Sequence, residues 1–146
     1  MSLKQYEFWF IAGTQSLYGP ETIKEVERHA KIMAEGWNKD AAIVGTVVFK
    51  GAVLDSASIQ KVIQEANNAP QCAGIIAWMH TFSPSKMWIA GLTRLQKPYL
   101  HLNTQFNRDI PWNEIDMDFM NTNQSAHGDR EHGFIGARLR LPRKVI

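Results

Sequence analysis

Four short apolar runs, separated by amphipathic segments, constrain the fold of this 146-residue chain more than any other feature. The runs cover residues 6–12, 42–49, 73–79 and 99–102. The third run is apolar on both faces of an extended strand, which suits a parallel sheet covered by helices on each side. The alternation therefore predicts an α/β fold: a three-layer, doubly wound parallel sheet of flavodoxin-like or Rossmann-like topology.

Three segments between these runs have the spacing of helices with one apolar face. The apolar positions are Ile23, Val26, Ala30, Met33 and Trp37 in the first segment and Ile59, Val62, Ile63 and Ala66 in the second. Asp55 or Ser56 is expected to cap the second helix. In the third segment, Ser83 is expected to cap and Pro84 to take the first helical position, where its missing N–H costs nothing.

Length and composition exclude several classes of protein. Residues 1–146 are expected to form one domain, because a chain of this length buries roughly 68–70% of its unfolded surface. A net charge of +2, from 16 basic and 14 acidic residues, argues against nucleic-acid binding. The single Cys72 excludes an internal disulfide and fits a buried thiol in the cytoplasm. No apolar stretch approaches the ~18 residues of a membrane helix, so no membrane partner is expected.

The last residues read like the start of a further strand. Pro142 ends a helical pattern, and an apolar run begins at 144–146. We interpret this as a fifth strand cut at its start, with fraying at an ordinary terminus as the alternative. If the interpretation holds, an exposed apolar patch near the last helix and the sheet edge should favour self-association.

Ligands of open α/β sheets bind beyond the carboxyl ends of the strands, where four loops are expected here. These loops are 13–21, 50–56, 80–84 and 103–109. With a flavodoxin-like order, Gln15 and Tyr18 would approach His80 and Phe82. The mixture of amide, hydroxyl and aromatic side chains suits a polyol. The glycine spacing of the first loop matches neither the dinucleotide fingerprint nor a P-loop, which argues against nucleotide binding there.

The histidines allow more than one interpretation. His80 is either a core residue bonded to a backbone carbonyl or part of a pocket. His101, between two leucines, is expected to be structural, and His29 is expected to face solvent from the first helix.

Residues 121–133 form a polar cluster. On a helix, His127 and Glu131 would share one face, and Asp129 and His132 another. One His/Glu pair supplies only two ligands, too few for a catalytic metal. The alternative interpretation places Asp129 and Glu131 at a helix N-terminus, where negative charge complements the helix dipole.

Four long motifs carry a resemblance to a known family. They are "WFIAGTQSLYGPE", "IIAWMHTFSPSKMWIAGL", "HLNTQFNRDIPW" and "IDMDFMNTNQSAHGDREHGFIGARLR". Together they resemble the N-terminal domain of L-arabinose isomerases, over the whole chain but only about the first third of a family member. The resemblance implies arabinose catabolism: isomerisation of L-arabinose to L-ribulose, and often of D-galactose to D-tagatose.

The same resemblance implies a divalent metal, typically manganese, held by two glutamates and two histidines of later domains. None of these four is in this chain, so it is expected to hold no catalytic residue and no metal ligand, and to be inactive alone. The resemblance also implies a homo-oligomer, a hexamer, in which this domain closes the site of a neighbouring subunit. The matching substrate-contact positions are Gln15, Leu17, Phe82 and His127, with Tyr18 and His80 as secondary candidates.

Three positions depart from the family pattern. Ser16 stands where histidine is usual, Asn103 where histidine or alanine is usual, and His132 where an aromatic residue is usual. These departures bear on subunit contacts and on sugar preference. The alternative hypothesis is a standalone α/β module that binds a sugar or nucleotide without catalysis.

Overall fold

A five-stranded, entirely parallel sheet forms the centre of the computed structural model, which describes residues 3–146 apart from the side chain of Ala126. The strands are β1 (Glu7–Gly13), β2 (Thr46–Val53), β3 (Cys72–Met79), β4 (Tyr99–Leu102) and β5 (Lys144–Val145). Their order is β2-β1-β3-β4-β5, so the chain reverses direction across the sheet between β1 and β3. This confirms the doubly wound parallel sheet and gives it the flavodoxin-like order.

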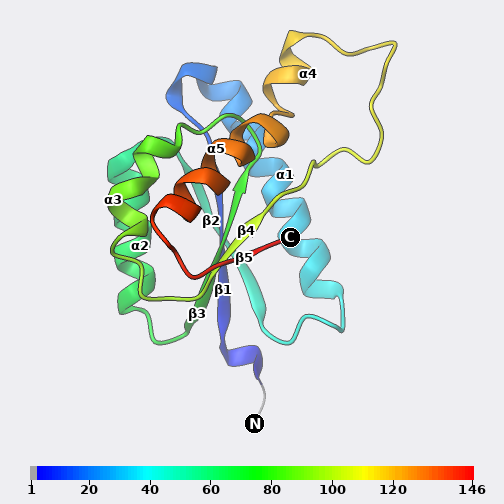
Figure 1. The fold of residues 1–146 in the computed structure, drawn as a ribbon. Helices are drawn as coiled ribbons and strands as arrows, with labels where there is room; N and C mark the ends of the chain where they lie inside the picture. Colours follow the sequence, from blue (N-terminus) through cyan, green and yellow to red (C-terminus); the bar gives the residue numbers. More distant parts are fainter. Residues whose placement is uncertain (1–2) are drawn as a thin grey trace.

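Helices cover both faces of the sheet (Figure 1). Helix α1 (Gly19–Lys39) lies on one face, and α2 (Ser56–Asn68), α3 (Ile89–Leu92) and α5 (Ser125–Arg138) lie on the other. The short α4 (Met117–Asn121) follows a long excursion of the chain after β4 (Figure 1). Three 3₁₀ turns, η1 (Leu3–Gln5), η2 (Ser16–Tyr18) and η3 (Ser85–Trp88), complete the elements. The three layers are as expected.

Strand alternation divides the core into two apolar layers. On β1, Phe10 packs towards α1, whereas Trp9 and Ile11 pack towards α2 and α3. Cys72 lies in the second layer as a buried thiol, and burial raises its pKa. No helix within the described part of the chain is long and apolar enough to span a membrane.

The apolar run at 42–49 predicts the position of the second strand incorrectly. The strand starts at Thr46, four residues later than expected, and continues through 50–53, which had been assigned to a loop. Lys50 and Gly51 together stand opposite Ile11 of β1, and Gly51 has a φ of +109°. This bulge lets the strand pass the polar Lys50 and remain paired as far as Val53.

The two expected caps had different outcomes. Asp55 caps α2, because its carboxylate accepts from the N–H of Ser58 and the Ser58 hydroxyl accepts from the N–H of Asp55. The Ser83 cap was wrong. Pro84 has an extended ψ of 116°, so the helical turn begins only at Ser85, and the Ser83 hydroxyl instead accepts from the Trp88 indole at 3.0 Å.

The expected fifth strand is present at the open edge of the sheet. Lys144 and Val145 pair with β4 in parallel, and Ile146 donates to the carbonyl of His101 at 3.1 Å. Beside this edge an apolar groove of about 530 Å³ runs between Trp37, Leu100 and Ile146. The groove is on the α1 face. Phe134 on α5 and Val145 and Ile146 at the edge are also exposed, so apolar side chains are exposed both at the sheet edge and on the last helix.

Candidate functional site

The carboxyl ends of β1 and β3 are tied together at the point where the strand order reverses. The hydroxyl of Thr81 donates to that of Thr14, and the N–H of Thr14 donates to the carbonyl of Val53. Gly13 allows this approach, since a Cβ there would lie 2.5 Å from the sulfur of Met79. The loops after β1 and β3 therefore leave the sheet side by side.

The first loop presents the candidates Gln15, Leu17 and Tyr18. Its 3₁₀ turn is closed by a hydrogen bond from the N–H of Tyr18 to the carbonyl of Gln15, at 3.3 Å. Gln15 and Tyr18 are half-buried, whereas Leu17 is 82% exposed. Thr14 makes the contact with the β3 loop, and the expected approach of Gln15 and Tyr18 to His80 and Phe82 stays a prediction.

The structure brings the candidates Phe82 and His127 together. Their ring centroids lie 5.1 Å apart, with the planes inclined by 57°. Phe82 follows β3 and His127 is in the first turn of α5, so the pair joins two distant parts of the sequence. Gly128 lets α5 approach the end of β3 closely, because a Cβ there would lie 3.3 Å from the Cβ of Met79. We call Phe82 and His127 the ring pair.

The expectation that His29 faces solvent was wrong. His29 is only 6% exposed, and its Nδ1 lies 2.7 Å from Nε2 of His80. Its ring stacks on Phe106 with centroids 3.7 Å apart, and His80 stacks on Trp78 at 4.2 Å. His80 is thus a core histidine, but its bonded partner is another histidine rather than a backbone carbonyl. The sequence held the signal: His29 comes three residues after Val26, on the same apolar face of α1.

Burial and a neighbouring cation set the protonation of this region. Burial lowers the pKa of His80 to about 3, and it also lowers the pKa of His29. The Arg28 guanidinium holds the pKa of Glu25 below its usual value. At neutral pH, both histidines are therefore uncharged and Glu25 is ionised.

A second buried polar cluster lies under α5, and it includes Asp129, which was expected at the start of the helix. Asp129 is the fifth residue of α5 and is buried, so it does not complement the start of the helix as expected. Its carboxylate lies 2.6 Å from Nε2 of His101, which is buried as expected of a structural residue. His132 lies 2.6 Å from the hydroxyl of Tyr99. These contacts fasten α5 to β4.

Burial also dominates the pKa values in this second cluster. It raises the pKa of Asp129, although the hydrogen bond from His101 opposes the rise. It lowers the pKa of His132 to about 3 and raises that of Tyr99. Tyr99 therefore stays protonated, and its hydroxyl donates a hydrogen bond to Nε2 of His132.

Comparison with known proteins gives a consistent match. The chain matches the family model described as "L-arabinose isomerase N-terminal domain" over residues 2–146. It is 60% identical over 146 residues to proteins named L-arabinose isomerase from Geobacillus kaustophilus, Thermotoga neapolitana and Herpetosiphon aurantiacus. Each match covers 100% of this chain and 29% of the relative, so the chain spans less than a third of these relatives.

Proposed function

The chain belongs to the L-arabinose isomerase N-terminal domain family, and from this premise we propose that it forms one wall of the sugar site of an aldose–ketose isomerase. The proposed reaction converts L-arabinose to L-ribulose, and also D-galactose to D-tagatose. The observation that carries the proposal is the ring pair, held at the carboxyl edge of the sheet where open α/β folds bind ligands.

The residue types at this edge suit a sugar. The Phe82 ring can cover the C–H face of a polyol, while the His127 imidazole and the Gln15 amide can hydrogen-bond its hydroxyls. Leu17 offers an exposed apolar surface on the neighbouring loop. We propose that these four residues contact the sugar, that Tyr18 supports the first loop, and that the chain supplies no group that moves the hydrogens of the substrate.

Manganese was the metal expected from the family resemblance, and the described residues do not fit it. Among residues 3–146, no group of three or more His, Cys, Asp or Glu side chains is placed to hold an ion. His127 and Glu131 would supply two ligands, and the buried His101 and Asp129 are bonded to each other. In our proposal, the metal of the isomerase is held by residues outside these 146.

Exposed apolar side chains support a role in assembly. The chain between β4 and α5 exposes Trp112 to 74% and Met117 to 66%, and α5 exposes Phe134 to 62%. Where such side chains form a contiguous patch, they mark contact with other proteins. We propose that the chain meets the catalytic part of a neighbouring subunit in a homo-oligomer, a hexamer. The proposed location is the cytoplasm, which the free thiol of Cys72 supports.

A domain exchange tests the proposal. Residues 1–146 replace the matching segment of the Geobacillus kaustophilus relative, and ketose formation is measured with added Mn²⁺ for the chimera and for this chain alone. We expect L-ribulose from the chimera and none from the chain alone. Phe82→Ala and His127→Ala should each raise the KM of the chimera about tenfold, equivalent to about 1.4 kcal/mol. Lys61→Ala, an exposed change on α2, is the matched control.

Two results would contradict the proposal. Ketose formed by the isolated chain would mean that it holds its own catalytic groups. An unchanged KM in both ring-pair variants would mean that the sugar does not meet this edge. Calorimetry on the chain with L-arabinose and with nucleotides tests the standalone binding module, which tight nucleotide binding would favour.

A further inference from the structure

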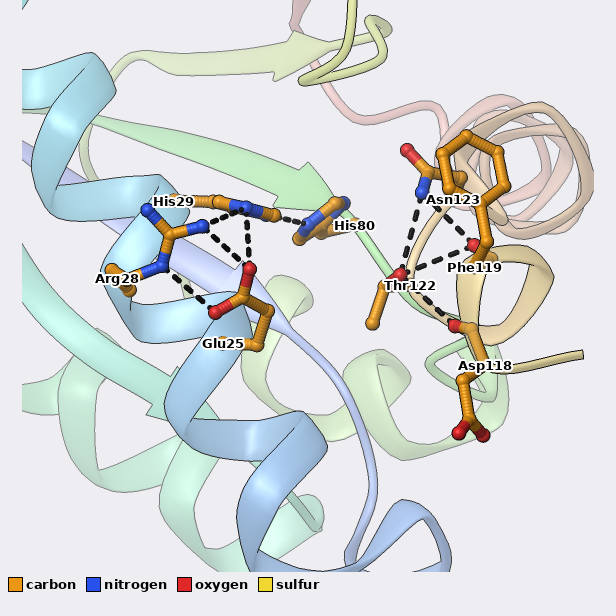
Figure 2. Close-up of polar contacts among 8 residues, drawn as sticks. All are labelled: Glu25, Arg28, His29, His80, Asp118, Phe119, Thr122 and Asn123. Carbon is orange, nitrogen blue, oxygen red and sulfur yellow. Dashed lines mark hydrogen bonds and ion pairs between the residues drawn. The ribbon is translucent and has the colours of Figure 1, made fainter. Parts of the chain in front are cut away.

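Three titratable side chains form a hydrogen-bonded row that runs from α1 into the core, and the proposed sugar contacts do not use it. Glu25 Oε1 lies 2.9 Å from Nε2 of His29, and Nδ1 of His29 lies 2.7 Å from Nε2 of His80. Figure 2 shows the row crossing from α1 to the end of β3. We call Glu25, His29 and His80 the relay.

The direction of the relay follows from what each group can donate. A carboxylate only accepts, and we assign the hydrogen of His29 to Nε2, from which it donates to Glu25. The neutral His29 ring then accepts at Nδ1, and His80 must donate from Nε2. Arg28 fixes the start of the relay, because its guanidinium donates to both oxygens of Glu25, at 2.8 and 2.6 Å. Its Nη2 also lies 2.8 Å from Nε2 of His29. If Nε2 accepted from Arg28, His29 would donate from Nδ1 and His80 would carry its hydrogen on Nδ1, so the tautomer of His80 tests the assignment.

Stacking holds the two rings in this register. Phe106, in the loop after β4, lies over His29 with an interplanar angle of 13°. Trp78, in β3, lies over His80 with an angle of 11°. The relay thereby joins α1, β3 and the loop after β4, and our assignment gives His80 the Nε2–H tautomer. Nδ1 of His80 has no hydrogen-bond partner in the part of the chain that the structure describes.

The backbone of His80 continues the connection to α5. Its carbonyl accepts from the N–H of Gln124 at 3.1 Å, and Gln124 is the N-cap residue of α5. The turn before Gln124 is fixed in its own right, since Asn123 Nδ2 donates to the carbonyl of Phe119 at 2.9 Å (Figure 2). Phe82 comes two residues after His80, and His127 three residues after Gln124. His80 is therefore connected through the backbone to both members of the ring pair.

We propose that Glu25, His29 and His80 are positioning residues for the ring pair. This inference rests on the proposed function and assigns the buried histidines a part in it. His80 is fully buried and so does not touch a ligand in this arrangement; it orients the residues that do. Misplacing a reacting or binding group by about 1 Å can cost about 100-fold in rate, so such support is functionally significant.

Nitrogen-15 NMR of the chain itself tests the relay without any activity. His29→Asn keeps an acceptor near the position of Nδ1, whereas His29→Leu removes it. We expect His80 to show the Nε2–H signature in the native chain and in His29→Asn, and to lose it in His29→Leu. The cross-relaxation between the Phe82 and His127 rings should weaken in the leucine variant only. An unchanged His80 signature, or unchanged ring contact, in His29→Leu would overturn the proposal.

A second pair of variants avoids the core. The Glu25 side chain is 39% exposed, so Glu25→Leu removes the acceptor without opening a cavity, and Glu25→Gln keeps an acceptor as the matched control. In the chimera, Glu25→Leu should raise the KM for L-arabinose severalfold and leave kcat within about twofold, with Glu25→Gln close to the native value.

The failures of the two proposals can be distinguished. If the ring-pair variants raise KM but Glu25→Leu and His29→Leu do not, the relay has no positioning role and the sugar site stands. If His29→Leu changes the His80 signature and weakens the contact between the two rings, but the ring-pair variants leave KM unchanged, the sugar site is wrong. In that case the relay orients two rings that meet no substrate, which overturns its proposed role as well.

Discussion

His132→Phe should reduce the unfolding free energy that this domain loses in mild acid. The His132 imidazole is buried against the Trp88 ring, with centroids 5.0 Å apart, and its Nε2 bonds the Tyr99 hydroxyl. The charged groups that face it are the pair of His101 and Asp129 and the guanidinium of Arg143. Burial first, and then the positive charges of His101 and Arg143, lower its pKa to about 3.

The magnitude follows from that pKa. The pKa of an unfolded histidine is near 6.5, whereas folded His132 stays unprotonated down to about pH 3. A depressed folded pKa gives stability that is present above the unfolded pKa and is lost as pH falls towards the folded one. Each pH unit below about 6.5 costs about 1.4 kcal/mol per group, so His132 loses about 2 kcal/mol between pH 7.5 and 5. His80, with the same shift, loses about as much.

The native chain should therefore lose about 4 kcal/mol from these two histidines over that range, and His132→Phe about 2. Asp129 acts with the opposite sign, because its raised pKa gives stability that is lost as pH rises. It is present in both proteins and cancels in the difference. At neutral pH, the variant should be about 1–3 kcal/mol less stable, since the buried Tyr99 hydroxyl loses its partner, and adding Tyr99→Phe should recover part of that cost.

Urea unfolding followed by circular dichroism at several pH values between 5 and 7.5 measures these free energies. His127→Phe is the matched control, because it makes the same change at an exposed position of the same helix. Parallel stability curves for His132→Phe and the native chain would refute the reasoning. That result would mean that folded His132 takes up its proton as readily as the unfolded chain does.

Three further changes have expected outcomes. Asp129→Leu should cost about 3–5 kcal/mol by urea unfolding, and the double change with His101→Leu should recover most of it; additive costs would mean that the buried pair is not coupled. Asp55→Ala should lower the urea midpoint through loss of the α2 cap, and no change in the midpoint would argue against that cap. Light scattering should show that the isolated chain self-associates, and Val44→Glu, at the rim of the apolar groove, should reduce the self-association. A clean monomer of the native chain at high concentration would contradict this expectation.

Much of the scaffold could be read from the sequence, because local patterns determine it. The fourth strand, Tyr99–Leu102, was predicted to the residue, and the fifth was recognised from three. The second was misplaced because its pairing passes through a bulge at Gly51, where the apolar pattern is interrupted. A run of apolar residues indicates that a strand exists, but the partner strand determines where it starts and ends.

The buried polar residues were harder to predict, for a different physical reason. A buried ionisable group is stable only with a specific partner, and the partners here are distant in sequence. His29 bonds His80 on β3, and Asp129 bonds His101 on β4. When its partner is unknown, a polar side chain on a helix is predicted to face solvent. Phe82 and His127 are site candidates only through the family resemblance, and their contact was not predicted, since no spacing rule relates the two residues.

The central claim is that the ring pair contacts the sugar in a site completed by another part of the enzyme. A crystal structure of the chimera with bound L-arabitol, a polyol without a carbonyl to isomerise, tests it most directly. Our account predicts the polyol against the Phe82 ring and within hydrogen-bond distance of His127. A polyol bound away from both residues would contradict it.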